Sequence, residues 1–180
     1  NHSSAARTLV GHDMAFINTG YGKAELLGIR IDGKGDATDT HIVWRLRKGA
    51  PNKPSPVLHN AHLYTVTDGG VASCIHPKTG EVIWQARIGG EYSASLLLSK
   101  GNIYCFDQGG TCLVFQANPK EFKQVSKSKL DDGFMSSPAV LLNSLILNQP
   151  ALKFSTSSLL FSQDVLSKSL QLDSVIINIF

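Results

Sequence analysis

The 180-residue sequence has few cysteines, few charges and no long apolar run. Its three cysteines, Cys74, Cys105 and Cys112, are too few for a disulfide scaffold and lack the paired spacing of a zinc site. No uninterrupted apolar stretch of about 18 residues occurs, so no transmembrane helix is predicted. Lysine and arginine exceed the acidic residues by 3 but form no run, which argues against nucleic-acid binding.

Signatures of catalysis are missing as well. The sequence has no Ser-His-Asp order, no glycine-rich phosphate loop and no Gly-x-Ser-x-Gly nucleophile elbow. The 6 histidines are dispersed, and although His59 and His62 bracket a turn, no third zinc ligand accompanies them. We therefore predict no catalytic, cofactor-binding or metal-binding residue.

The composition that is present favours a β-rich globular protein. Hydrophobic residues make up 42% of the chain and charged residues 17%, which is enough apolar material for a buried core. The 16 glycines lie between short runs rich in Val, Ile, Leu and Tyr. Short β-favouring runs separated by glycine predict many short strands and an all-β fold.

An internal repeat is the strongest feature of the sequence. Sliding the chain against itself by 40 residues superposes several unlike features at once. They are Trp44 on Trp84, Ser55 on Ser95, Tyr64 on Tyr104, Gly69-Gly70 on Gly109-Gly110, and the run 63–66 on 103–106. A further copy begins at 136–139, where Ser-Ser-Pro-Ala repeats the Ser-Pro step at Ser55.

Each repeat unit reads as four short strands joined by tight turns. In the unit that is clearest, the predicted strands are 56–59, 62–67, 71–76 and 82–87. Asp68-Gly69, and Gln108-Gly109 one unit later, predict two-residue type I′ hairpins, because that turn needs positive φ at both central positions. Four antiparallel strands per 40 to 45 residues is the period of a propeller blade.

We therefore predict β-propeller blades of four antiparallel strands, about three of them, followed by an irregular C-terminal tail. The predicted partial propeller covers 1–147, with blades at about 1–47, 48–88 and 89–128 and the start of a further blade at 129–147. Three blades are too few to close a ring, so the predicted ring is incomplete and the missing blades of the same chain are expected partners.

The two ends of the chain differ from the repeat. The first residue, Asn1, follows no initiator Met, and we interpret this end as the cut end of a longer chain that has lost any signal peptide. In 148–180 the turn pattern stops, and Ser and Leu dominate. Two interpretations of this atypical tail stay open: a native C-terminal extension, or sequence that is not native because of a reading-frame error.

The segment 74–84, CIHPKTGEVIW, resembles the signature of the PQQ-like β-propeller repeat family, within the quinoprotein dehydrogenase-like superfamily. Thr79, Gly80 and Trp84 match the family's Thr-Gly turn and tryptophan, whereas His76 stands where the family has Asp. The resemblance implies that the turn closes one blade and that the tryptophan staples it to a neighbour. Trp44 would do the same one blade earlier.

The resemblance also implies a function and a location. Members of this kind are bacterial, usually exported repeat proteins, so we expect a periplasmic or extracellular scaffold that binds a protein, peptide or carbohydrate through its rim loops. The alternative is a fragment of a PQQ-dependent quinoprotein dehydrogenase, in which PQQ is held with calcium. No such ligand set, and no adjacent cysteine pair, is assignable here, so we predict that no cofactor is bound. A carbohydrate-active enzyme is a weaker third alternative.

One loop is predicted as a partner-contact site. Asp131, Asp132 and Phe134 precede the innermost strand of the third repeat, which places two carboxylates beside an aromatic ring near the axial opening. The loops 48–54 and 89–92 occupy the equivalent places in earlier units. The simpler interpretation is a solvated loop whose Phe134 fills the core.

Two further groups leave alternatives open. Asp32, Asp36 and Asp39 share one glycine-containing loop that either collects oxygen ligands for calcium or is an ordinary exposed hairpin loop. Cys105 and Cys112 flank Gln108-Gly109 symmetrically, so a two-residue hairpin would place them opposite each other, either as a disulfide or as two buried thiols.

Overall fold

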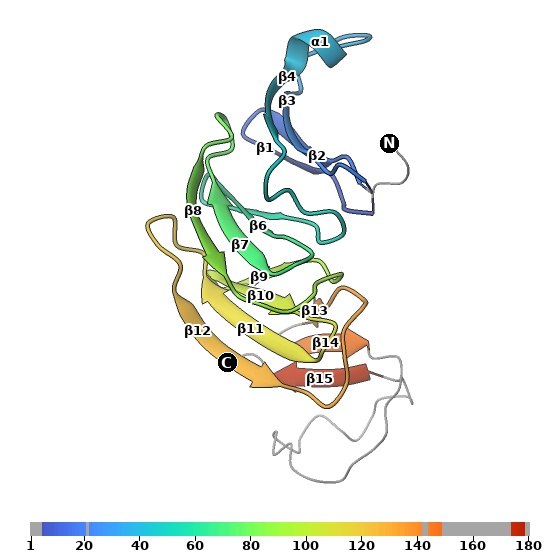
Figure 1. The fold of residues 1–180 in the computed structure, drawn as a ribbon, viewed down its shortest axis with the longest axis vertical. Coiled ribbons are helices and arrows are strands. Elements are labelled where there is room, and N and C mark those ends of the chain that lie inside the picture. Colours follow the sequence, from blue (N-terminus) through green and yellow to red (C-terminus); the bar gives the residue numbers. More distant parts are fainter. Residues whose placement is uncertain (1–4, 21, 142–143, 149–173, 179–180) are drawn as a thin grey trace.

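A computed structural model describes residues 5–20, 22–141, 144–148 and 174–178 as four antiparallel sheets that follow one another in an arc (Figure 1). The first sheet is β1 (Leu9–Gly11), β2 (Met14–Asn18), β3 (Leu26–Arg30) and β4 (Ile42–Leu46); the second is β5 (Val57–His59), β6 (His62–Val66), β7 (Val71–Ile75) and β8 (Val82–Arg87). The third is β9 (Leu97–Ser99), β10 (Asn102–Phe106), β11 (Thr111–Gln116) and β12 (Gln124–Lys129); the fourth is β13 (Ala139–Leu141), β14 (Ser144–Asn148) and β15 (Ser174–Asn178).

This architecture confirms the predicted fold class. Each of the first three sheets has four strands in sequence order, as expected for propeller blades, and a short helix, α1 (Thr38–His41), lies in the insertion of the first sheet. Among the described residues, no helix is long and apolar enough to cross a membrane. Of the atypical tail, β15 pairs with β14; residues 149–173 and 179–180 lie outside the described residues.

The turn chemistry differs from the prediction in an informative way. A type I′ turn has positive φ at both turn residues. This is found at His12-Asp13, Asn60-Ala61 and Lys100-Gly101, which join the first two strands of each of the first three sheets. The turns at Asp68-Gly69 and Gln108-Gly109 are instead three-residue loops closed by a glycine with positive φ, Gly70 and Gly110. The type I′ prediction for these two turns was wrong because the loop holds one residue more.

A β-bulge recurs at the same place in all three sheets. The register between the third and fourth strands shifts at Gly28/Ile29, at Cys74/Ile75 and at Val114/Phe115. The extra residue on the outer strand, which has no partner in the ladder, is Val43, Ile83 or Val125, and each is solvent-exposed (50%, 39% and 51%). The next residues along the outer strands are Trp44, Trp84 and Ser126, which the bulges therefore identify as equivalent.

The hydrophobic core lies between sheets. We call the interface of the first and second sheets the first seam, and that of the second and third sheets the second seam. The first seam buries Met14, Phe16, Leu26 and Trp44 against Leu63 and Ile75. The second seam buries a larger set, including Tyr64, Val66 and Cys74 against Ile103, Cys105, Leu113 and Phe115. Because each sheet hides a face only by stacking on its neighbour, the sheets stabilise one another.

Candidate functional site

Trp44 joins the first sheet to the second. Its indole Nε1–H donates to the backbone carbonyl of Pro77 at 2.7 Å, in the β7–β8 turn. The ring lies between two glycines: a Cβ on Gly80 would come within 2.6 Å of the indole, and a Cβ on Gly28, its cross-strand partner, would overlap it. Gly80 also has φ +73°, so it is required both for the turn and for the space beside the ring.

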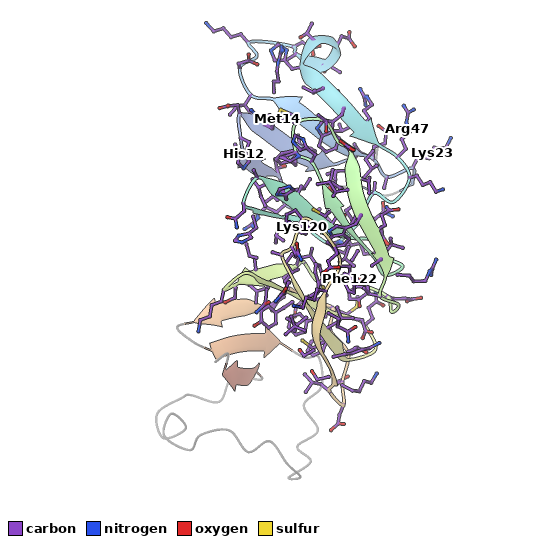
Figure 2. All side chains as sticks on the ribbon, turned by 90° about the vertical axis from the view of Figure 1, so that its left-hand side faces the viewer. His12, Met14, Lys23, Arg47, Lys120 and Phe122 are labelled. Atoms are coloured by element: carbon purple, nitrogen blue, oxygen red, sulfur yellow. The ribbon has the colours of Figure 1, made fainter. Side chains whose placement is uncertain are left out.

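Trp84 makes the equivalent link from the second sheet to the third. Its Nε1–H donates to the carbonyl of Asn118 at 2.9 Å. Here the turn between β11 and β12 is longer, and Phe122 (Figure 2) fills the place beside the ring, with its centroid 5.8 Å from the indole. Phe115 packs edge-on at 6.2 Å. The structure thus places both predicted staple tryptophans against the turn of the following sheet, with Thr79-Gly80 as the receiving turn for Trp44.

The predicted partner-contact loop is divided between core and surface. Phe134 is 1% exposed, and its ring packs against Phe106 with centroids 5.1 Å apart. Asp131 is exposed, whereas Asp132 is half-buried and accepts the Gly133 N–H at 3.0 Å. The apolar residue that this loop presents to solvent is Met135, 59% exposed, which the sequence argument did not single out.

The buried aromatic residue of this loop has a counterpart in the loop that follows the second sheet. The backbone N–H of Phe134 donates to the Asp107 carbonyl, and that of Tyr92 to the Asp68 carbonyl. Tyr92 is also 1% exposed, so both rings are buried where the chain passes from one sheet to the next. In the loop 48–54, Asn52 occupies this place, and its N–H donates to the Asp68 carboxylate at 2.7 Å. Backbone hydrogen bonds fix the two later loops to the sheets, and the bond to the Asp68 carboxylate fixes the loop 48–54, so the three loops form one preformed rim.

The first seam has a polar interior where the second is apolar. Asn18, Thr65 and Ser73 are at most 3% exposed, and by strand alternation they face the same seam as Phe16, Leu63 and Ile75. Ser73 Oγ accepts from Gln85 Nε2 at 3.2 Å, while Thr65 Oγ1 has no hydrogen-bond partner among the residues that the structure describes. The equivalent strand positions facing the second seam hold Val66, Cys105 and Leu113.

A row of serines links the sheets close to the innermost strands. Ser95 Oγ donates to Ser55 Oγ at 2.9 Å, and the backbone N–H of Ser95 donates to Ser137 Oγ at 3.0 Å. The Arg7 N–H extends the row by donating to Ser55 Oγ at 2.8 Å. The recurrence of these serines was visible in the repeat, but their contact with one another was not, because sequence period alone does not show which faces meet.

The three cysteines are buried free thiols. Phe106, not Cys105, pairs with Cys112, and Cys105 pairs with Leu113. Cys105 lies in the second seam and Cys112 in the cluster on the opposite face of the third sheet, so the expectation that they face each other was wrong. Burial raises the pKa of Cys74 and of Cys112 to about 11, and burial also raises the pKa of Cys105 well above its usual value.

The acidic loop of the first sheet is organised by hydrogen bonds within the loop. Asp36 accepts from the Thr38 N–H at 3.0 Å, which lowers the pKa of its carboxyl. Asp32 pairs with Arg30 and His41, each at 3.3 Å. No group of three or more His, Cys, Asp or Glu side chains within the described ranges is arranged to hold a metal ion, and Asp39 contributes to none.

Comparison with known proteins points to one family. The model of the family described as outer membrane protein assembly factor BamB matches residues 33–124, about half of the chain. No curated protein matches the sequence significantly. BamB from Moraxella catarrhalis is similar in structure, with TM-score 0.62 and 15% identity over 82% of this chain and 42% of that protein. The chain thus spans less than half the length of that relative.

Two other solved structures share the fold at low identity. A europium-containing methanol dehydrogenase matches with TM-score 0.52 and 12% identity, covering 68% of this chain and 24% of that one. The computationally designed Ika4 protein matches with TM-score 0.65 and 8% identity, covering 100% of this chain and 94% of that one. At these identities the similarity concerns the fold alone.

Proposed function

The chain belongs to the PQQ-like propeller family described as outer membrane protein assembly factor BamB, and on this premise we propose that it is a non-catalytic scaffold that binds a protein or peptide partner. The contact runs through the rim formed by the loops 48–54, 89–92 and 131–135. The observation that carries this proposal is the rim itself, which hydrogen bonds from the backbone N–H groups of Asn52, Tyr92 and Phe134 hold in place while Asp131 and Met135 remain exposed.

The chemistry of the rim favours a polypeptide over a carbohydrate. Its aromatic rings, Tyr92 and Phe134, are buried and so do not present a face on which a sugar could stack. Met135 is a flexible apolar side chain that can pack against a partner. The carboxylate of Asp131, in the same loop, can pair with a basic group of that partner and so fix its orientation. By its family, the protein would act in the periplasm or outside the cell, which fractionation of cells expressing the full-length chain would test.

Site-specific photo-crosslinking tests the rim. A photoreactive phenylalanine analogue replaces Met135 in one sample and Lys127, on the exposed outer strand β12, in the control. We expect a light-dependent adduct with a partner protein from position 135, lost when Asp131→Lys is added, and none from position 127. Equal adducts from both positions, or none from position 135, would contradict the proposal.

A second candidate is a fragment of a quinone-dependent dehydrogenase. The structural match to the methanol dehydrogenase favours it, although the described residues show no ligand set for calcium. Titration of the full-length chain with PQQ and calcium, followed by the absorbance of the quinone, separates the two candidates. A saturable spectral change would support the dehydrogenase, and its absence at micromolar concentrations would support the scaffold.

A further inference from the structure

The rim opposite the proposed partner loops carries a hollow of about 500 Å³. Its walls come from four segments: the β1–β2 turn with His12 and Asp13, the end of β3 with Arg30 to Asp32, the bulge residue Val43, and Lys78 in the β7–β8 turn of the next sheet. Met14 forms the floor. Figure 2 labels His12 and Met14, at the start of β2. A volume of this size suits a large side chain or a small ligand.

The walls of the hollow are held rigidly. Met14 is 4% exposed and belongs to the core of the first seam. The Ile31 N–H donates to the carbonyl of Asp13 at 3.3 Å, which ties β3 to the turn. Lys78 follows Pro77, whose carbonyl accepts the Trp44 indole, so the second sheet is fixed against the first at this point. A rigid hollow of this kind is ready to bind without reorganisation.

The exposure of the aliphatic side chain at the bulge recurs in the next two sheets. Val43 is 50% exposed, and its counterparts Ile83 and Val125, which have a neighbouring sheet on each side, are 39% and 51% exposed. Ile31, 52% exposed, adds a second aliphatic side chain beside Val43. The hollow therefore offers solvent-accessible aliphatic surface next to charged groups.

The charges around the hollow are of two kinds. Arg30 and Asp32 pair with each other, and His41 pairs with the same carboxylate. Asp13 and Lys78 have no ion-pair partner within the part of the chain that the structure describes. A complementary ligand brings an apolar group for the hollow, a carboxylate for Lys78 and a basic group for Asp13.

We infer that this hollow is a second binding site, distinct from the proposed rim, for an extended peptide whose aliphatic side chain has one basic and one acidic residue two positions away, on either side. In an extended peptide every second side chain points to the same side, so the central side chain enters the hollow while the charges two residues away reach its edges. The lining residues include no Phe, Tyr or Trp, which disfavours a sugar, and the presence of both Asp13 and Lys78 disfavours a purely anionic ligand.

The test is an NMR titration of the isotope-labelled full chain with blocked peptides. The probes contain Lys-Gly-Leu-Gly-Glu, the reverse order Glu-Gly-Leu-Gly-Lys, or Lys-Gly-Ser-Gly-Glu between Gly-Ser ends. We expect one leucine peptide to shift the amide signals of His12, Ile31 and Lys78, and the serine peptide to bind at least tenfold more weakly. Equal binding of the serine peptide would overturn the inference, as would binding of dodecylphosphocholine monomers without binding of either leucine peptide.

Matched variants locate the site. Val43→Asp and Ile83→Asp change the same bulge position in successive sheets, and both residues are exposed, so both variants are expected to fold. Val43→Asp should abolish the shifts and Ile83→Asp should leave them unchanged, while Lys78→Glu should weaken binding at least fivefold. Equal effects of the two Asp variants would overturn the site. A chain that forms the Met135 adduct but shows no peptide shifts would retain the proposed function and lose this inference.

Discussion

The first and second seams use the same staple in two different settings. Trp44, 8% exposed, fits a slot between two glycines, whereas half-buried Trp84 is surrounded by aromatic rings and a longer turn. Both indoles donate one hydrogen bond to a carbonyl of the next sheet. The hydrogen bond is therefore common to both seams, whereas the packing around the indole ring differs between them.

The interiors of the two seams also differ, and the seam that holds its tryptophan more tightly has the more polar interior. The seam with the tighter slot contains Asn18, Thr65 and Ser73, and the seam with the aromatic cluster contains apolar side chains at the same positions. A buried hydroxyl without a partner costs about 1–3 kcal/mol. The close fit of Trp44 offsets a less favourable interior, so we expect the first seam to depend more strongly on its staple than the second.

The largest expected effect is the loss of Trp44. Trp44→Ala should lower the free energy of unfolding by about 4 kcal/mol, because it removes a buried ring and its hydrogen bond. Trp84→Ala should cost about 2 kcal/mol, since a smaller part of this ring is buried and Phe122 can move toward the gap. Urea unfolding followed by circular dichroism measures both. Equal losses of unfolding free energy in the two variants would show that the first seam does not depend more strongly on its tryptophan than the second.

Gly80→Ala tests the slot without touching the tryptophan. The added methyl would lie 2.6 Å from the indole of Trp44, and the residue has φ +73°. We expect a loss of about 3 kcal/mol in unfolding free energy from overpacking and backbone strain together. Gly101→Ala is the control, because it has φ +74° with open space around it, and should cost about 1 kcal/mol. Similar losses would show that backbone strain alone sets the cost.

The polar interior of the first seam is tested on two side chains that lie directly opposite each other, Thr65 and Ser73. Thr65→Val replaces a buried hydroxyl without a partner and should raise the unfolding free energy by about 1 kcal/mol. Ser73→Ala removes the acceptor of Gln85 and should lower it by about 1 kcal/mol. Destabilisation by Thr65→Val would indicate that its hydroxyl binds water in solution.

The smallest effect concerns the thiols. Because burial raises the thiol pKa values, only a small thiolate fraction exists at pH 8, and alkylation of the native chain by iodoacetamide should be slow. Cys112, 7% exposed with a pKa of about 11, should react before Cys105, 1% exposed, and its rate should rise about tenfold per pH unit below that pKa. Intact mass without reductant should show three labels in urea, and a single label would indicate a disulfide.

The sequence was sufficient for the repeat and the strands, because each repeat carries its own turn and strand signals. It was insufficient wherever a shift of one residue in strand pairing decides which side chains face each other. The extra residue in the loop after Asp107 moves Cys105 out of line with Cys112. The simpler interpretation of the loop at 131–134, that Phe134 fills the core, agrees with its burial. The polar first seam depends on which faces of adjacent sheets meet, and no local pattern around Asn18 or Thr65 carries that information.

Ser126 stands on β12 where Trp44 and Trp84 stand on their outer strands. The third sheet therefore has no indole at the position from which Trp44 and Trp84 donate a hydrogen bond to the next sheet. A force applied along the arc would act equally on each interface between neighbouring sheets. We expect the interface beyond β12 to separate first, while the three sheets joined by Trp44 and Trp84 stay together.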